Sequence, residues 1–368
     1  MASSEKDLEA PLLGRLRPEV RSIRAYRLEP HPASVKLDQN ENSYDPPEAI
    51  GRAIRDALSR LALNRYPPVQ ATELKSALGK LNDWPVDGVL VGNGSNELLH
   101  MLALSTLERG RSVVFPTPSF IVYSYVSRML GAEMVEVPLR ADHTYDVDAF
   151  VRAMREKKPS LVFLCSPNNP TGSSLSTLDI ERIAKECLGI LVVDEAYFEF
   201  GGSVARELLP RYPHMVLSRT FSKAIGLAGL RIGYLLAAPE LAEEVEKAQL
   251  PYALNGFSRA VALAVCDHYE LIRKQAKMIV EERDALYSKL GDLDGVHPYP
   301  SEANFILFDC DAGATPVFDG LLARGVLVRN LSSSPSPSLS RALRVTVGRP
   351  DENKKFLNAL CETVEELR

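Results

Sequence analysis

The chain has 368 residues, enough for one large and one smaller domain, and its 45% hydrophobic and 25% charged residues are typical of a globular protein. Its formal net charge of −5 disfavours a surface that binds nucleic acid or anionic membranes, so we expect neither as a partner. The sequence has no apolar run long enough to cross a bilayer, no closely paired cysteines and no histidine cluster, so we expect a cytoplasmic protein without a membrane span, disulfide or metal.

Residues 1–45 are expected to form an N-terminal arm that packs on the smaller domain. Residues 17–25 predict a short helix, because Pro18 is tolerated in a first helical turn, where its missing N–H group has no partner to lose. Residues 37–47, LDQNENSYDPP, then predict an extended segment that leads into the large domain.

Residues 46–256 predict the large domain, in which short apolar strands alternate with helices such as 95–108 and 176–187. The strands are expected at residues 88–92, 112–116, 134–138, 160–165, 189–194, 215–219 and 232–237. Nearly continuous apolar strands separated by helices indicate a mainly parallel sheet that helices cover on both faces. The fold class is therefore expected to be α/β.

Residues 257–368 predict a smaller α+β domain. Its expected elements are a long helical region at about 257–290, strands at 304–308, 325–329 and 342–348, and a last helix at 351–367. The Ser/Pro-rich segment 332–340 has the composition of a flexible linker, and its place between two candidate anion-binding arginines leaves the role of a lid open.

Polar residues follow three neighbouring strands of the large domain, where they would suit one ligand. Asn169 lies in the turn SPNNPTG, Asp194 ends the strand GILVVD, and Lys223 follows the strand MVLSR. Each has an ordinary explanation by itself, as a turn residue, a helix cap or a surface lysine. Ligands of open α/β sheets bind at the carboxyl ends of the strands, so the three together predict one site.

With these motifs the chain resembles the fold-type I, pyridoxal-phosphate-dependent aminotransferases of classes I and II, and within them the group that acts on histidinol phosphate. The resemblance extends from about Arg17 to the C-terminus. It rests on the motifs RPEVR, LDQNEN, NRYPP, NGSNE, SPNNPTG, VVDEAYFEF, RTFSKAIGLAGLRIGY, ANFIL and LRVTVG. The block around Lys223 is the most specific of them.

The resemblance implies pyridoxal 5'-phosphate as the cofactor and three catalytic residues. Lys223 would form the Schiff base with the cofactor aldehyde and then move the substrate proton, a role that suits lysine because burial lowers its pKa readily. Asp194 would accept the N–H of the protonated pyridine ring, which makes the ring an electron sink. Tyr197 and Asn169 would both reach the ring oxygen O3′.

Further cofactor contacts follow from the same resemblance. The backbone amides at a helix N-terminus suit the cofactor phosphate, and an aromatic ring is expected over the pyridine face. The phosphate residues would be Gly94, Ser95, Asn96, Thr220, Ser222 and Arg231, and the ring would be that of Phe120. Tyr66, in NRYPP, would cross to the partner's cofactor, which implies a homodimer with shared active sites.

The substrate side is implied by two arginines of the smaller domain. Arg344 alternates with apolar residues in LRVTVG, so it lies on the opposite face of its strand from them. A planar guanidinium group can bind a carboxylate or phosphate through two hydrogen bonds. The resemblance assigns Arg344 and Arg329 to the anionic end of the substrate, together with Asn40 and Glu41.

The implied reaction transfers an amino group from a small-molecule donor, L-histidinol phosphate, to 2-oxoglutarate by a ping-pong cycle through pyridoxamine phosphate. Within the family, an aromatic-amino-acid aminotransferase and a threonine-phosphate decarboxylase remain alternatives, since Ser43 and the segment 331–341 depart from the usual pattern near the substrate. A nucleotide-binding module is disfavoured because Glu97 replaces the third glycine of a dinucleotide-binding turn. A non-catalytic regulator is disfavoured because the N-terminus is too short for a DNA-binding helix-turn-helix.

Overall fold

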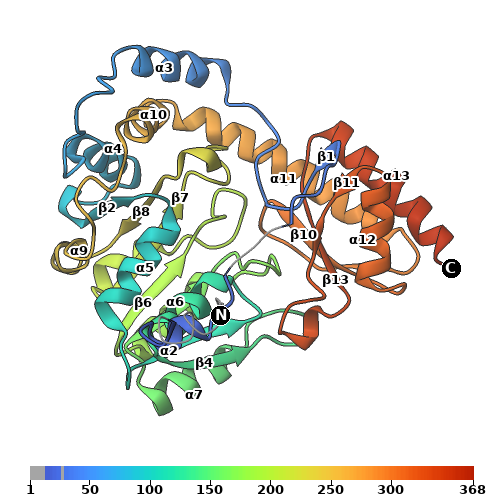
Figure 1. Cartoon of the computed structure of the whole chain (residues 1–368), viewed down its shortest axis with the longest axis horizontal. Coiled ribbons are helices and arrows are strands. Elements are labelled where there is room, and N and C mark those ends of the chain that lie inside the picture. Colours follow the sequence, from blue (N-terminus) through green and yellow to red (C-terminus); the bar gives the residue numbers. More distant parts are fainter. Residues whose placement is uncertain (1–12, 26–28) are drawn as a thin grey trace, which may run out of the picture.

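The protein, in a computed structural model, is described for residues 13–25 and 29–368. Its large sheet has seven strands in the order β2-β8-β7-β6-β5-β3-β4, at the left of Figure 1. The strands are β2 (Val89–Gly92), β3 (Ser112–Thr117), β4 (Glu133–Pro138), β5 (Leu161–Cys165), β6 (Ile190–Asp194), β7 (Met215–Thr220) and β8 (Gly233–Leu236). Only β8 runs antiparallel to its neighbours in this sheet. The expected mainly parallel sheet is confirmed, with each strand within one residue of its predicted bounds.

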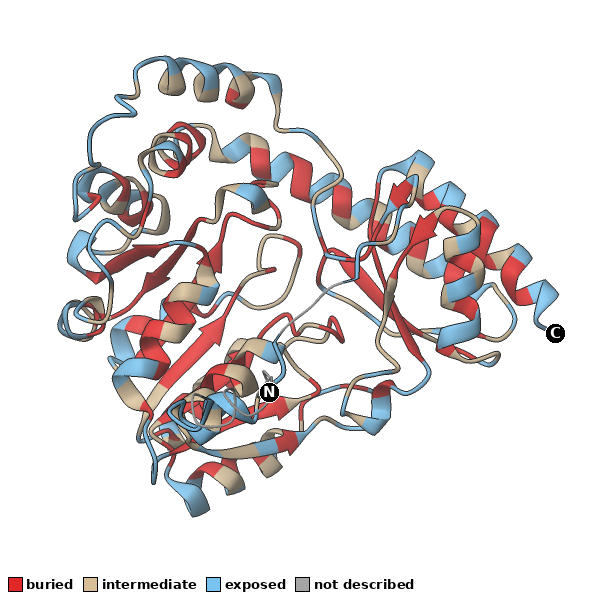
Figure 2. Cartoon of the chain, viewed as in Figure 1, coloured by how far each residue is buried: buried red, intermediate tan, exposed pale blue. Residues whose placement is uncertain are grey.

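Helices cover both faces of this sheet, because successive residues of a buried strand point to opposite faces. Leu90 and Phe163 face α5, α6 and α9, whereas Val89 and Val162 face α4, α7 and α8. The helices on this side of the molecule are α3 (Glu48–Ser59), α4 (Thr72–Asn82), α5 (Ser95–Thr106), α6 (Ile121–Leu130), α7 (Val147–Lys157), α8 (Thr177–Glu186), α9 (Pro239–Glu246) and α10 (Gly256–Cys266), with short 3-10 turns η1 (Val86–Gly88), η2 (Ala205–Arg211) and η3 (Ala228–Leu230). Figure 2 shows most of these strands buried between the two layers, whereas the edge strand β4 is partly exposed.

The second unit is a four-stranded antiparallel sheet in the order β12-β13-β10-β9, at the right of Figure 1. Its elements are α11 (Tyr269–Gly291), β9 (Val296–Pro298), β10 (Phe305–Cys310), α12 (Ala314–Ala323), β12 (Arg329–Asn330), η4 (Pro337–Leu339), β13 (Ala342–Thr346) and α13 (Pro350–Glu366). The N-terminal strand β1 (Val35–Lys36) pairs in parallel with β11 (Val326–Leu327) of this unit. No helix within the described ranges is long and apolar enough to span a membrane.

Two helix predictions differ from the structure. The region 257–290 forms two helices, α10 and α11, which are separated at residues 267–268. The chain turns there because α10 packs on α3 and α4, whereas α11 packs on β9 and β10 of the second unit. The predicted helix 17–25 is shorter: α2 spans Pro18–Arg21 and packs against α6.

The predicted strand 325–329 is also divided, into β11 and β12, which belong to two different sheets. Val326 pairs with Val35 of β1, whereas Arg329 pairs with Arg344 of β13. The division therefore depends on partners that are remote in the sequence. A continuous apolar run cannot reveal such a change of partner.

The Ser/Pro-rich segment 332–340 connects β12 to β13 and is anchored at one end. Leu339, which ends η4, is only 2% exposed and packs with Leu307 and Ala342. The expectation of a flexible linker is therefore wrong at this end, because Leu339 is buried. A single leucine produces no apolar periodicity, so the sequence pattern did not indicate this contact. Whether the segment acts as a lid stays a prediction.

Candidate active site

The carboxyl ends of β5, β6 and β7 bring polar residues to one edge of the large sheet. The strand register pairs Cys165 with Asp194, and Asp194 with Ser218. Asn169 lies in the loop that follows β5, and Lys223 in the loop that follows β7. Because the three strands are parallel, these loops leave the sheet at the same edge.

Asp194 is buried, with 2% of its surface exposed. Its Oδ2 atom accepts a hydrogen bond from the hydroxyl group of Tyr123 at 2.8 Å, whereas Oδ1 is buried and has no hydrogen-bond partner among the described residues. Burial raises the pKa of the Asp194 carboxyl to about 6. A buried carboxylate oxygen without a donor is costly, so this position suits a cationic N–H group.

Lys223 is held against the N-terminal segment. Its Nζ atom donates to the carbonyl oxygen of Gln39 at 2.9 Å and lies 5.7 Å from the centre of the Tyr197 ring. Burial, followed by the positive charge of Arg344, lowers the pKa of Lys223 to about 7. Such a lysine is largely neutral in mildly alkaline water and can act as a nucleophile or base.

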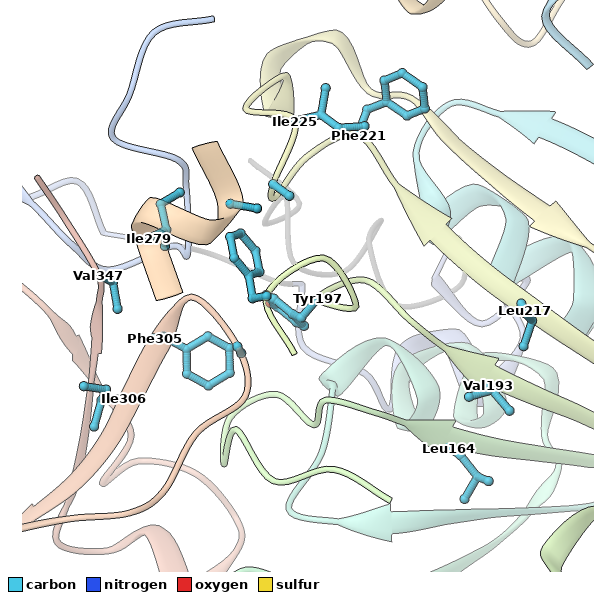
Figure 3. Packing of buried hydrophobic residues seen from close by; sticks show 14 of the residues in the cluster. Leu164, Val193, Tyr197, Leu217, Phe221, Ile225, Ile279, Phe305, Ile306 and Val347 are labelled. Atoms are coloured by element: carbon cyan, nitrogen blue, oxygen red, sulfur yellow. The ribbon is translucent and has the colours of Figure 1, made fainter. Parts of the chain in front are cut away.

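Tyr197 connects the two units of the molecule. Its ring packs edge-on against Phe305 with the centroids 5.2 Å apart, and Figure 3 shows the two rings side by side between the large sheet and the second unit. Its hydroxyl group accepts a hydrogen bond from Nδ2 of Asn40 at 3.0 Å. Asn40 also donates its backbone N–H to Thr346. Asn40, predicted to contact substrate, therefore contacts Tyr197 directly.

The N-terminus of α5 lies beside the guanidinium group of Arg231. Gly94 has a φ of +84°, and a Cβ atom there would lie 2.5 Å from Nη2 of Arg231, so glycine permits this close approach. Arg231 itself has a φ of +53°, a left-handed conformation that costs a non-glycine residue about 1–2 kcal/mol. The first amides of α5, at Ser95 and Asn96, together with this charge form a site suited to a phosphate group.

Two hydroxyl groups of the loop before Lys223 lie next to this site. Ser222 accepts a hydrogen bond from Nη1 of Arg231 at 3.3 Å. Thr220 donates to Ser222 at 3.0 Å and accepts the backbone N–H of Ser222. Thr220 therefore orders the loop, and Ser222 is the hydroxyl group in contact with the arginine.

Arg344 and Arg329 lie directly opposite each other on antiparallel strands, so their side chains share one face of the sheet. Arg344 is buried; its guanidinium donates to the carbonyl oxygen of Asp38 at 2.8 Å and to the side-chain oxygen of Asn169. Arg329 is partly exposed. The contact with Asn169 joins this face of the second unit to the loop after β5.

Three predicted site residues form no hydrogen bond, ion pair or ring contact with the other predicted site residues of the described chain. Tyr66 is 81% exposed and its ring stacks on Tyr252, 4.6 Å away, and on no predicted site residue of the described chain. Glu41 is exposed and forms an ion pair with Lys36. Phe120 lies at the start of α6 and packs edge-on against Tyr123 at 5.7 Å.

The sequence reasoning missed Tyr123 and two backbone carbonyl groups. Tyr123 lies in an apolar helix, where a tyrosine is indistinguishable from a core residue before its hydroxyl partner is known. The carbonyl oxygens of Asp38 and Gln39 bind Arg344 and Lys223. Backbone groups leave no trace in residue identity, so only the neighbouring LDQNEN motif could have indicated them.

The profile of aminotransferase classes I and II matches residues 32–360. A histidinol-phosphate aminotransferase of Caldanaerobacter subterraneus subsp. tengcongensis is 38% identical over 94% of this chain and 98% of that protein. A histidinol-phosphate aminotransferase 2 of Nitrosococcus oceani is 39% identical over 94% of this chain and 96% of its own length.

The solved structure of histidinol-phosphate aminotransferase from Sinorhizobium meliloti in complex with pyridoxal-5'-phosphate has the same fold. Its TM-score is 0.87 at 26% sequence identity, over 96% of this chain and 98% of that structure. The family profile covers well over half of the chain, and the relatives exceed 30% identity over nearly their whole length. The chain therefore belongs to the family of class I and II aminotransferases.

Proposed function

We propose that this chain is a histidinol-phosphate transaminase (EC 2.6.1.9) that uses pyridoxal 5'-phosphate and converts L-histidinol phosphate and 2-oxoglutarate into imidazole acetol phosphate and glutamate, a step of histidine biosynthesis. One observation carries the chemistry: Lys223, with a pKa lowered to about 7, lies at the same sheet edge as the unpartnered Oδ1 atom of Asp194. The names of the relatives support the donor. When bound, the protonated ring of the cofactor withdraws electrons from the reacting carbon.

The residues fit this cofactor at both of its ends. Asp194 would hold the ring nitrogen through Oδ1, which lacks any donor within the described residues. The N-terminus of α5, Arg231 and Ser222 would hold the phosphate, because Gly94 lets the guanidinium group of Arg231 lie close to this helix end. Both sets lie at the same edge of one sheet: Asp194 ends β6, and the phosphate residues lie where the chain leaves β2 and β7.

Lys223 would be the catalytic acid and base. Its amine is neutral in a large fraction of molecules near pH 7, so it can take a proton from one of the two carbons bonded to the transferred nitrogen and return it to the other. The carbonyl oxygen of Gln39 accepts a hydrogen bond from this amine and so orients it.

Asn40 would determine which way the Tyr197 hydroxyl group points. Because Nδ2 of Asn40 donates to the tyrosine oxygen, the tyrosine proton is available for another acceptor, the ring oxygen O3′. Burial raises the pKa of Tyr197, so the hydroxyl group keeps this proton. Asn169 is held nearby by Arg344 and would contact the same oxygen.

The paired guanidinium groups of Arg329 and Arg344 support an anionic substrate. Directly opposite positions on antiparallel strands place both charges on one face, where a dianionic phosphate would be held by both groups. An uncharged aromatic side chain would gain less there. Glutamate, the product of the second half-reaction, would use the same face through a carboxylate.

An exposed apolar surface supports a homodimer in which Tyr66 reaches the partner's site. The surface comprises large side chains of the loop before α4, of the loop before α10 and of the first turn of α10, and it includes a stacked aromatic pair. Its members are Leu63, Tyr66, Val69, Leu250, Tyr252 and Phe257. Contiguous exposed apolar side chains of this size are characteristic of protein contacts.

The division of the chain and its location are also proposals. The pairing of β1 with β11 supports an N-terminal arm, residues 1–45, on a C-terminal domain. Because α10 packs on α3 and α4, a boundary near residue 267 fits these contacts better than one after residue 256. We place the protein in the cytoplasm, where the buried, unpaired thiol groups of Cys165 and Cys310 would stay reduced.

Single-turnover spectroscopy tests the proposed substrate. The purified, cofactor-loaded protein is mixed with histidinol phosphate, histidinol, phenylalanine or threonine phosphate, and the loss of the visible band of the lysine-bound cofactor is followed. We expect histidinol phosphate to react far more efficiently than the other three. Equal reaction of phenylalanine would favour an aromatic-amino-acid aminotransferase, and release of carbon dioxide from threonine phosphate would favour a decarboxylase.

A further inference from the structure

Tyr123 is a buried tyrosine whose hydroxyl group contacts the carboxylate assigned to the cofactor. It lies on the first turn of α6 and has no exposed surface. Its hydroxyl group donates to Oδ2 of Asp194 at 2.8 Å, and no other side chain among the described residues donates to this carboxylate. The other donor to this carboxylate is the backbone N–H of Ala196, so within the described residues Tyr123 is the side chain that donates a hydrogen bond to Asp194.

The ring of Tyr123 is fixed by aromatic neighbours on several sides. It stacks on Phe163 with the centroids 4.5 Å apart and the planes 10° apart, and it meets the edge of Phe120 at 5.7 Å. Burial raises the pKa of this phenol well above its usual range, and the charge of Asp194 adds to the shift. The hydroxyl group therefore remains a donor at any physiological pH, and its direction is set by the packing of the ring.

The hydrogen bond opposes the effect of burial on Asp194. Burial favours the neutral acid, and the negative charge of Glu195 favours it too, whereas the hydrogen bond from Tyr123 favours the carboxylate. The bond also occupies only Oδ2 and leaves Oδ1 without a partner within the described chain. Because the bond from Tyr123 lowers the pKa of Asp194, a proton between Asp194 and the ring nitrogen of the cofactor would stay on the nitrogen.

We propose that Tyr123 is a positioning residue that keeps Asp194 ionised and turns its Oδ1 atom toward the ring nitrogen of the cofactor. The inference rests on the proposed function, because it takes the cofactor ring to lie beside Asp194. It extends that function to a residue without contact to substrate or cofactor. Phe120, on the same turn of α6, would cover the ring face, so a single helical turn fixes both contacts.

The test removes one oxygen atom and compares the result with a matched control. Tyr123→Phe removes the donor to Asp194, whereas Tyr145→Phe removes an equally buried hydroxyl group that donates to the backbone carbonyl of Cys165, the strand neighbour of Asp194. The readouts are the dissociation constant of pyridoxal 5'-phosphate, the ¹⁵N chemical shift of its ring nitrogen in the bound state, and the kcat and KM for the donor.

In Tyr123→Phe we expect the ¹⁵N shift to move toward that of unprotonated pyridine and kcat to fall about ten- to a hundredfold, the range for a hydrogen bond to a charged group. The KM for the donor should change little, since Tyr123 does not contact it. Tyr145→Phe should keep the wild-type ¹⁵N shift and kcat. A wild-type ¹⁵N shift in Tyr123→Phe, or equal effects of both substitutions, would overturn the inference.

A double-mutant cycle tests whether Tyr123 acts through Asp194. In an Asp194→Asn background the charge is gone, so adding Tyr123→Phe should change cofactor affinity less than about twofold. Additive effects of the two substitutions would exclude action through the carboxylate. If the wild type binds the cofactor with a protonated ring but transaminates no donor, the proposed function fails while the ¹⁵N comparison still decides the role of Tyr123. If the wild type binds no cofactor, both fail.

Discussion

At the scale of single residues, burial favours the uncharged forms of both Lys223 and Asp194, because it lowers the pKa of the lysine and raises the pKa of the aspartate. The pKa of the lysine falls to about 7, and that of the aspartate rises to about 6. The lysine is thereby a nucleophile near neutral pH. The aspartate, in contrast, is partly protonated near pH 6, and a positive charge such as a protonated ring nitrogen would favour its ionised form. The two shifts therefore suit the protein before and after it binds its cofactor.

Lys223→Ala should abolish the visible band of the bound cofactor and leave the fold intact. Within the described chain the amine donates to the carbonyl oxygen of Gln39 and lies near the Tyr197 ring, and Lys223 lies on a loop, so its removal opens no cavity in the sheet. Absorption spectroscopy and far-ultraviolet circular dichroism measure the two effects. Borohydride reduction of the wild type should fix the cofactor on Lys223, and a reduced peptide containing a different lysine would contradict the assignment.

The rate at which pyridoxal 5'-phosphate attaches to the cofactor-free protein should rise with pH and level off above about 7. Only the neutral amine reacts, so each pH unit below the lowered pKa of Lys223 reduces the reactive fraction about tenfold. Stopped-flow absorbance gives this profile. An unshifted lysine would continue to gain reactivity up to about pH 10, and such a profile would show that burial does not act as described.

Arg329→Ala should weaken reaction with histidinol phosphate more than reaction with glutamate. The substitution removes one of two guanidinium groups on a shared face, and a dianionic phosphate depends on both. We expect a loss of about ten- to a hundredfold in kcat/KM for the phosphorylated donor, the range for a charge-assisted contact, and a clearly smaller loss for glutamate. Arg341→Ala, which removes an exposed arginine near the same sheet, is the control and should affect neither donor. Equal losses for both donors in Arg329→Ala would argue against a phosphate site.

At the scale of elements, the sequence predicted the strands of the large sheet well because all of them except the edge strand β4 are buried on both faces and therefore read as continuous apolar runs. It also located Asn169, Asp194 and Lys223, which follow three of these runs. It could not predict that β8 runs antiparallel, that 325–329 contributes to two sheets, or that Tyr123 binds Asp194. Each of these depends on a partner far away in the chain.

The segment 332–340 should be mobile at its centre and fixed at its end. Leu339 is buried, whereas the serine and proline residues before it have no apolar side chain to bury. We expect rapid hydrogen exchange for the serine amides of this centre (Ser333, Ser334, Ser336 and Ser338) in the free protein, slower exchange with a phosphorylated donor, and protection of Leu339 in both states. Leu339→Ala should remove that protection. Unchanged exchange of the serine amides on binding would exclude a lid.

At the scale of the whole molecule, one chain supplies the lysine, the aspartate, the phosphate site and the arginine pair, but not every predicted contact. Tyr66 is exposed and stacks on Tyr252 within an apolar surface. Exposure of apolar side chains to water is unfavourable. In a twofold-symmetric dimer, a second copy of the chain would cover this surface. The proposed homodimer would therefore both cover this surface and bring Tyr66 close to the partner's site.

Subunit exchange tests whether Tyr66 serves the partner's site. Lys223→Ala and Tyr66→Ala proteins, each inactive or nearly so, are mixed and allowed to exchange subunits, which native mass spectrometry verifies. If Tyr66 acts across the interface, each heterodimer has one site with both lesions and one intact site, so random exchange should restore about a quarter of wild-type activity. A mixture of Lys223→Ala and Asp194→Asn is the matched control: both residues follow strands of the same sheet in one chain, so every heterodimer site keeps a lesion and no activity should return. Verified exchange without recovery in the Tyr66 mixture would place Tyr66 in the site of its own chain or outside the site altogether.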